Sequence, residues 1–221
     1  CTWVILSSNQ TPDRYKNRLS SYAECYRNVQ IEYCDYYEDV NVLYKAMGDR
    51  YVEDNDFLLS TRIDSDDMLA VDFVARLQSY VLSNLSTGAV LSLPNGVQWF
   101  EKDKMAFAVS YSQNHFLSFL EYRHNIRTCL GIDHTKVSEQ TLVLLPRTAM
   151  WCEIVHGNNI CNGYTPAYHY SKCVVKLGSF PILLPEFHAL RQYLFIVREH
   201  IRFRYHQVGR GLRKLVGCHT S

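Results

Sequence analysis

The stretch that decides the fold runs from Phe57 to Asp67 and reads FLLSTRIDSDD. Its first seven residues, up to Ile63, are rich in apolar and β-forming side chains and predict a strand. Asp64, Asp66 and Asp67 follow at once. Carboxylates this close repel one another, and a folded protein accommodates them when a cation lies between them. Because open α/β sheets bind ligands at the carboxyl ends of their strands, the stretch predicts a site for Mg²⁺ or Mn²⁺.

Two other interpretations of the acidic cluster follow from its local sequence. Asp66 or Asp67 is also suited to capping the helix predicted to follow, with the remaining carboxylates in solvent. An EF-hand is excluded, because its sixth and twelfth positions require Gly and Glu and here hold Leu69 and Ala75.

The sequence on both sides of this stretch alternates strand and helix patterns. Apolar residues at helical spacing predict a helix over 72–83, and Pro94-Asn95-Gly96 predicts a tight turn. Such alternation indicates one α/β domain with a mixed, mostly parallel sheet flanked by helices. The other expected strands cover residues 2–7, 29–33, 89–93 and 97–100, the other helices cover 14–27 and 39–50, and 150–162 is strand or helix.

The composition of the chain excludes some classes of protein. The chain has 221 residues, 47% of them hydrophobic, and its 23 Lys and Arg nearly cancel its 22 Asp and Glu. This balance argues against a disordered chain and against a nucleic-acid partner. The chain opens on Cys1 and runs at once into an apolar strand pattern, so we expect a fragment of a longer protein. A cytoplasmic location is favoured, and the Golgi lumen is the alternative if an upstream anchor has been lost.

A second polar patch lies about 90 residues after the acidic cluster. Residues 151–159 read WCEIVHGNN, an apolar approach followed by His156, by Gly157 and by two amides. Neutral imidazole is a common metal ligand, so His156 is a candidate third ligand beside the carboxylates. The alternative is a histidine satisfied within a turn.

Two classes of enzyme use an Asp-x-Asp pair after an apolar strand. In haloacid-dehalogenase-type phosphatases the pair lies on the first strand of the domain, whereas in GT-A glycosyltransferases it lies mid-domain. Asp64 and Asp66 follow two earlier strand–helix units, and this location favours the second class. A metal-dependent phosphohydrolase and a non-catalytic binding module that retains the fold remain the alternatives.

Several motifs resemble the putative rhamnosyltransferase family, a bacterial-type group of glycosyltransferases to which the GT-A fold is attributed. They lie in the family's order over about residues 2–165, and the family has a preceding strand and helix that this chain lacks. The resemblance therefore implies a GT-A-like domain over residues 1–190, truncated at its N-terminus. The motifs are Trp3-Val4-Ile5-Leu6 with Thr11-Pro12, STRIDSDD at 60–67, Pro94-Asn95-Gly96, NHFLSFLE at 114–121, and Trp151 with His156-Gly157-x-Asn159.

The resemblance implies sugar transfer, with rhamnose as one candidate sugar, from a nucleotide-diphosphate donor to a hydroxyl of a carbohydrate or lipid-linked acceptor. Asp64, Asp66 and His156 are then the predicted ligands of Mn²⁺ or Mg²⁺. Arg62 is suited either to a donor phosphate or to pairing with these carboxylates. Asn95 and Asn159 are further candidates for contacting the donor, and Trp99 suits stacking on a sugar ring or a place in the core.

An inverting transfer also needs a general base for the acceptor hydroxyl. Glu121 follows an apolar stretch that would desolvate it and raise its pKa, and is the first candidate. Glu153, three residues before His156, is the second. A glutamate on a solvated face is the alternative for Glu121.

The last residues, 191–221, predict a basic helical tail outside the resemblance. From Arg191 to Lys214 there are seven Lys and Arg against one acid, Glu199. Such a tail suits peripheral contact with an anionic membrane surface, and a solvated helix that offsets an acidic site is the alternative.

Overall fold

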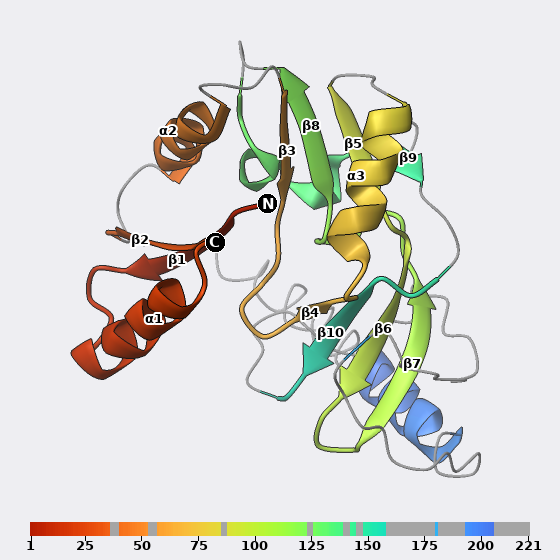
Figure 1. Cartoon of the computed structure of the whole chain (residues 1–221). Helices are drawn as coiled ribbons and strands as arrows, with labels where there is room; N and C mark the ends of the chain where they lie inside the picture. The colour runs from red at the N-terminus through yellow and green to blue at the C-terminus, as the bar shows by residue number, and fades with distance from the viewer. Residues whose placement is uncertain are drawn as a thin grey trace, which may run out of the picture.

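The structure is a computed structural model that describes residues 1–35, 40–52, 57–84, 88–122, 126–138, 142–144, 148–157, 180 and 193–205. These residues form a mixed α/β fold with three small sheets (Figure 1). The strands are β1 (Trp3–Ser8), β2 (Val29–Cys34), β3 (Phe57–Thr61), β4 (Met68–Leu69), β5 (Ala89–Ser92), β6 (Asn95–Phe100), β7 (Met105–Ser110), β8 (Ser118–Tyr122), β9 (Leu142–Leu144) and β10 (Trp151–Val155). The helices are α1 (Asp13–Cys25), α2 (Val40–Val52), α3 (Phe73–Ser83), the short 3₁₀ turns η1 (Cys129–Gly131) and η2 (His134–Lys136), and a helix over residues 193–205.

The strands do not form the mostly parallel sheet that the sequence predicted. One four-stranded sheet has the order β3-β8-β5-β9 and the other the order β4-β10-β6-β7, while β1 and β2 form a pair of their own. Four of the seven strand pairings are antiparallel. The reason is that β6 and β7 are joined by a tight turn, which forces an antiparallel pair, and that β8 inserts between β3 and β5 in the opposite direction. A GT-A-like topology stays a prediction.

The N-terminal unit matches the predicted order of elements but not the burial typical of its apolar pattern. β1 and β2 pair in parallel through α1, as a strand–helix–strand unit should. The apolar pattern of the first strand is typical of a buried strand, yet Trp3 is 39% exposed and α1 contributes no fully buried side chain. The principal core therefore lies elsewhere.

That core forms where α3 meets both four-stranded sheets. Phe73, Leu77 and Val81 are the buried face of α3, which confirms the helix predicted over 72–83. They belong to one apolar cluster with Leu91 and Trp151. Because residues from both sheets share this cluster, it sets the position of one sheet relative to the other.

Trp151 is the more deeply buried of the two tryptophans in this cluster and fixes the backbone around it. Its ring stacks on Phe116 with centroids 4.9 Å apart, and its Nε1–H donates to the carbonyl of Leu93 at 2.7 Å. A Cβ on Gly96 would lie 2.1 Å from this ring. Gly96 of β6 therefore leaves room for the Trp151 ring to lie against the backbone. The sequence predicted a tight turn over 94–96, whereas the structure has a strand that begins at Asn95.

None of the described helices combines the length and the apolar character needed to span a membrane.

Candidate functional site

The acidic cluster lies where the chain passes from one four-stranded sheet to the other. β3 ends at Thr61, which pairs with Ser118 at the start of β8. β4 begins at Met68 and pairs with Cys152 of β10. Figure 1 shows the connection running from the lower end of β3 down to β4. Side chains on this connection therefore meet residues from the start of β8 and from the second half of β10.

Asp67 is the buried centre of the cluster. Its side chain is 0% exposed, its Oδ1 accepts the backbone N–H of Ile154 at 2.9 Å, and its Oδ2 lies 2.8 Å from Nε2 of His115. Neither Asp67 nor Asp66 caps a helix, because Asp72 occupies the position before α3. The helix-cap interpretation of these two residues was therefore wrong, and Asp67 faces the site.

His115 is presented by a rigid loop built around Asn114. The buried amide of Asn114 donates to the carbonyls of Leu93 at 3.1 Å and Tyr111 at 2.8 Å, and its Oδ1 accepts the N–H of Phe116 at 3.0 Å. These three bonds fix the backbone on both sides of His115.

We expect Asn114→Ala to lower the free energy of unfolding by about 2 kcal/mol or more, because it removes all three bonds and takes away the acceptor of the buried N–H of Phe116. Urea denaturation measures this loss. Asn84→Ala is the matched control, since Asn84 is exposed and its amide donates only to the carbonyl of Tyr80. It should change stability by less than about 0.5 kcal/mol, and equal losses in both variants would contradict the role assigned to Asn114.

Asp64, Asp67 and His115 together form a group of metal-binding type. Each offers one ligand atom, and these atoms lie within 4.8 Å of one another. Two carboxylate oxygens and one imidazole nitrogen are a donor set that suits a divalent cation of intermediate hardness such as Mn²⁺. Asp64 was a predicted ligand, whereas Asp67 and His115 were not.

Asp66 and His156, the other two predicted ligands, are brought together beside this group. The Oδ2 of Asp66 lies 3.1 Å from Nε2 of His156, although the residues are 90 positions apart. Gly157, which follows His156, has φ +85°, a backbone conformation that suits glycine. Both side chains are partly exposed, so the pair lies nearer to solvent than Asp67.

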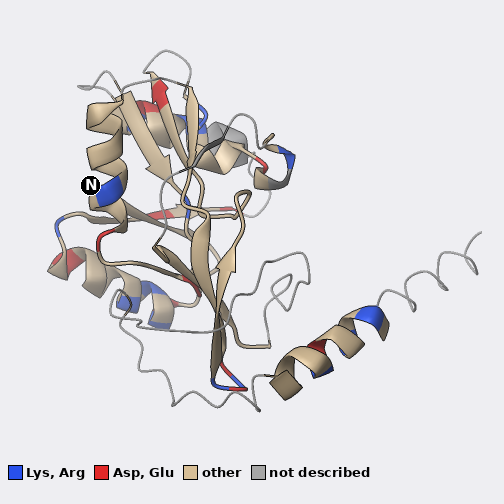
Figure 2. Cartoon of the chain, turned by 90° about the vertical axis from the view of Figure 1, so that its right-hand side faces the viewer, with Lys and Arg blue, Asp and Glu red and all other residues tan. Residues whose placement is uncertain are grey.

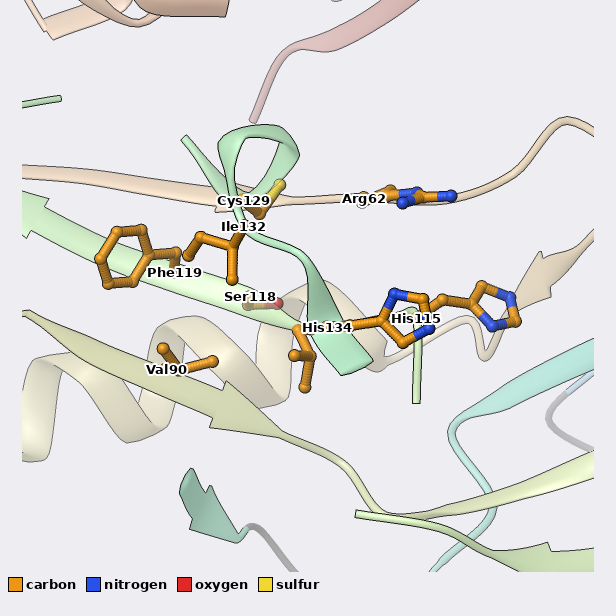
Figure 3. A pocket seen from close by; sticks show the side chains of 9 residues that line it. Arg62, Val90, His115, Ser118, Phe119, Cys129, Ile132 and His134 are labelled. Atoms are coloured by element: carbon orange, nitrogen blue, oxygen red, sulfur yellow. The ribbon is translucent and has the colours of Figure 1, made fainter. Parts of the chain in front are cut away.

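Arg62 pairs with a carboxylate, one of its two predicted roles. Its Nε and Nη2 lie 3.0 and 3.3 Å from the two carboxylate oxygens of Asp64. Figure 3 shows Arg62, His115 and His134 toward one end of a small pocket whose other end is lined by apolar side chains, among them Phe119. Burial lowers the pKa of His134, and the neighbouring His115 and Arg62 lower it further. His134 is thus favoured as a neutral imidazole at this rim.

Glu153 is buried next to the acidic cluster. It is 3% exposed, and its Oε2 accepts a hydrogen bond from Nε2 of Gln98 at 3.1 Å. Burial raises the pKa of Glu153 to about 7, with His115 opposing the shift and Asp67 adding to it. A carboxyl group with this pKa can take up a proton near neutral pH, which is the property required of a general base.

Glu121, the first candidate base, has contacts of a structural kind. Its two carboxylate oxygens accept the backbone N–H groups of Arg127 and Thr128 at 2.9 and 2.8 Å. Burial raises its pKa, as predicted, while these two bonds lower it. Glu121 lies three residues beyond Ser118 along β8, about 10 Å from the end of the strand next to the acidic cluster. These contacts do not support a role in proton transfer.

The remaining predicted residues lie away from the cluster or outside the described residues. Asn95 begins β6 three residues before Gln98, a separation of about 10 Å along the strand. Trp99 is buried in the apolar core, the second of its two predicted places. Asn159 lies outside the described residues.

Sequence reasoning missed His115 and Gln98 and underrated Asp67. His115 lies within the NHFLSFLE segment, but it has no spacing relation to residues 64–67 that would mark it as a ligand. Gln98 is one polar residue in an apolar strand, VQWF, and this was the available signal, since a polar side chain inside such a strand needs a buried partner.

The fold and the site together define a mixed α/β protein with a carboxylate–imidazole group at the junction of two sheets. The profile of the family described as "Putative rhamnosyl transferase" matches residues 1–168. The chain belongs to this family, which confirms the resemblance drawn from its motifs, and the description names a glycosyl transfer. No curated protein matches the chain, and no solved structure does either.

Proposed function

We propose that the protein is a metal-dependent glycosyltransferase that moves a sugar, rhamnose by the family's description, from a nucleotide-diphosphate donor to a hydroxyl of a carbohydrate or lipid-linked acceptor. The observation that carries this proposal is the group Asp64, Asp67 and His115, with Glu153 buried next to it, in a member of this family.

Asp64, Asp67 and His115 are the residues that would hold Mn²⁺ or Mg²⁺. Asp67 is the most firmly placed of the three, because the N–H of Ile154 fixes one of its oxygens and burial excludes water from the other. Such an ion, when bound, neutralises charge that develops on a leaving diphosphate. Asp66 and His156, predicted earlier as ligands, supply a further carboxylate and imidazole on the solvent side.

Glu153 is the general base in this proposal. The hydrogen bond from Gln98 orients the carboxylate of Glu153. Burial raises the pKa of Glu153 to about 7, near the pH at which a general base works best. In an inverting transfer it would accept the proton of the acceptor hydroxyl while the oxygen of that hydroxyl attacks the anomeric carbon. The bond between that carbon and the diphosphate oxygen would break, and the nucleoside diphosphate would leave with the electron pair.

Arg62 and His134 form the side of the site suited to the donor's phosphates. The guanidinium of Arg62 is partly exposed and paired with Asp64, so it can exchange this carboxylate for a phosphate oxygen. His134, at the same rim, offers a neutral N–H donor.

We expect Asp67→Asn to weaken Mn²⁺ binding about a hundredfold, because it removes one negative ligand while the amide oxygen still accepts the N–H of Ile154. Mn²⁺ titration followed by electron paramagnetic resonance of the free ion measures this change without requiring turnover. Asp72→Asn is the matched control, since Asp72 pairs with Arg76 on the surface and lies outside the group.

The same titration compares the two candidate ligand sets. Asp66→Asn should weaken Mn²⁺ binding less than about tenfold if Asp64, Asp67 and His115 are the ligands. Unchanged binding in Asp67→Asn together with lost binding in Asp66→Asn would instead support the set Asp64, Asp66 and His156.

A metal-dependent phosphohydrolase is the second candidate, because the same carboxylate group suits phosphate chemistry. Incubation with a panel of nucleotide sugars, and separately with p-nitrophenyl phosphate, distinguishes them. Release of nucleoside diphosphate with Mn²⁺ supports sugar transfer, and release of p-nitrophenol without cleavage of any nucleotide sugar overturns it. Donor binding without turnover of either substrate would instead identify a non-catalytic binding module.

A further inference from the structure

The helix over residues 193–205 is attached to the rest of the protein by one face. Phe195 is buried, with its ring 4.7 Å from that of Phe100 and 5.2 Å from that of Phe107. Arg198 forms two hydrogen bonds, 3.0 and 2.9 Å long, with the carboxylate of Asp103 in the β6–β7 turn. Figure 2 shows the helix reaching outward from the body of the chain.

The opposite face is apolar and exposed. At about 100° per residue, its five large side chains fall within an arc about 120° wide, on the far side from Phe195. Their exposure ranges from 37% to 79%. A mainly apolar arc of this width is the usual sign of a surface that contacts something else. The arc consists of Tyr193, Leu194, Val197, Ile201 and Tyr205.

Cationic side chains border the arc. Arg204 lies within the arc and Arg198 lies just beyond one edge of it, whereas Arg202 lies nearer to the side of Phe195. Arg198 pairs with Asp103 and Glu199, and Arg202 pairs with Glu199. The sequence after the helix adds Arg210, Arg213 and Lys214. An excess of positive charge beside the arc favours an anionic partner and opposes the pairing of two such helices.

We propose that this helix binds the surface of an anionic lipid membrane, with the apolar arc in the interface and Arg204 at the lipid headgroups. Lying in the interface plane requires an apolar face, a basic polar face and amphipathic rings at the water boundary, and Tyr193 and Tyr205 provide such rings at the two ends. The helix does not cross the membrane, and its attachment through Phe195 and Arg198 keeps the β6–β7 turn close to the surface. This inference does not depend on the proposed sugar transfer.

Sedimentation of the full chain with phospholipid vesicles tests the proposal. We expect binding to phosphatidylcholine vesicles that contain phosphatidylglycerol, weak binding to phosphatidylcholine alone, and loss of binding at high salt. Ile201→Asp should weaken binding about tenfold or more, because it places a charge in the middle of the arc that would enter the membrane interface. Leu82→Asp is the matched control, since Leu82 is also a large exposed apolar side chain but lies on α3, and its replacement should leave binding unchanged.

Equal binding by Ile201→Asp and the unaltered chain would overturn the proposal, as would the absence of binding to anionic vesicles. A concentration-dependent dimer in light scattering that Ile201→Asp abolishes, without vesicle binding, would assign the arc to a second copy and also overturn it. Circular dichroism confirms that each variant is folded.

Discussion

Replacing Glu153 with Gln is expected to lower the rate of the proposed sugar transfer by about 10²–10⁴-fold, the range typical of a general base, and to make the protein more stable above pH 7. Gln keeps the shape of the side chain and can bond to Gln98, but it cannot accept the proton of an acceptor hydroxyl. In the unaltered protein kcat/KM should rise with pH as Glu153 loses its proton, because only the carboxylate acts as a base. Burial raises the pKa of Glu153 to about 7, and a cation held by the neighbouring Asp67 and His115 would lower it. The variant should lose this rise.

The gain in stability follows from the same pKa. Glu153 binds its proton more tightly in the folded state, with a pKa of about 7, than at the ordinary value of 4.5. Its contribution to stability is fully present below pH 4.5 and is lost as the pH rises through about 7. The difference corresponds to about 3 kcal/mol. Glu153→Gln removes this loss, so its melting temperature should exceed that of the unaltered protein above pH 7 and match it at low pH.

Glu121→Gln is the comparison that separates the two candidate bases. The amide has one acceptor oxygen where the carboxylate offers two, so the N–H groups of Arg127 and Thr128 are no longer both satisfied, and we expect a loss of stability. Turnover per folded molecule should remain. Full turnover in Glu153→Gln with none in folded Glu121→Gln would return the role of base to Glu121.

Gly96→Ala is expected to lower the free energy of unfolding by about 3 kcal/mol or more. The added methyl carbon would lie 2.1 Å from the ring of Trp151. That ring is fully buried and held by its stack on Phe116 and its bond to Leu93, so it cannot move without breaking both contacts. A single domain is stable by only about 5–15 kcal/mol, so this loss is a large part of the total.

Urea denaturation gives the measurement for Gly96→Ala, and Gly131→Ala is the control. A Cβ on Gly131 would meet only the side chain of Arg127 at 3.5 Å, an ordinary contact. The control should change stability by less than about 0.5 kcal/mol. If both variants unfold at the same urea concentration as the unaltered protein, the packing argument for Gly96 fails.

Local patterns predicted the elements of the fold better than their pairing. The apolar spacing of α3 follows from helical geometry, and Phe73, Leu77 and Val81 are indeed its buried face. The direction of β8 could not be predicted this way, because its partners β3 and β5 come from residues 57–61 and 89–92. Alternation within a strand says which side chains share a face and nothing about which strand lies beside it.

The same limit explains the site. The acidic loop was found because its charges are adjacent in sequence, and His156 was considered because a glycine and two amides follow it. His115 meets Asp67 only because Asn114 and the β8 strand place it there, and no spacing in the sequence encodes that contact. Glu121 and Glu153 both follow apolar residues, so the sequence does not distinguish them. The fold shows that Glu121 accepts backbone N–H groups, whereas Glu153 lies beside the carboxylates of the site.

The five residues of β10 have an evolutionary consequence. This short strand bears Trp151 in the core, Glu153 at the site and the N–H of Ile154 that fixes Asp67. Few substitutions there can alter the choice of substrate without also unfolding the protein. We therefore expect new sugar or acceptor preferences to arise in the η1–η2 segment that lines the pocket, while β10 changes slowly as the family diversifies.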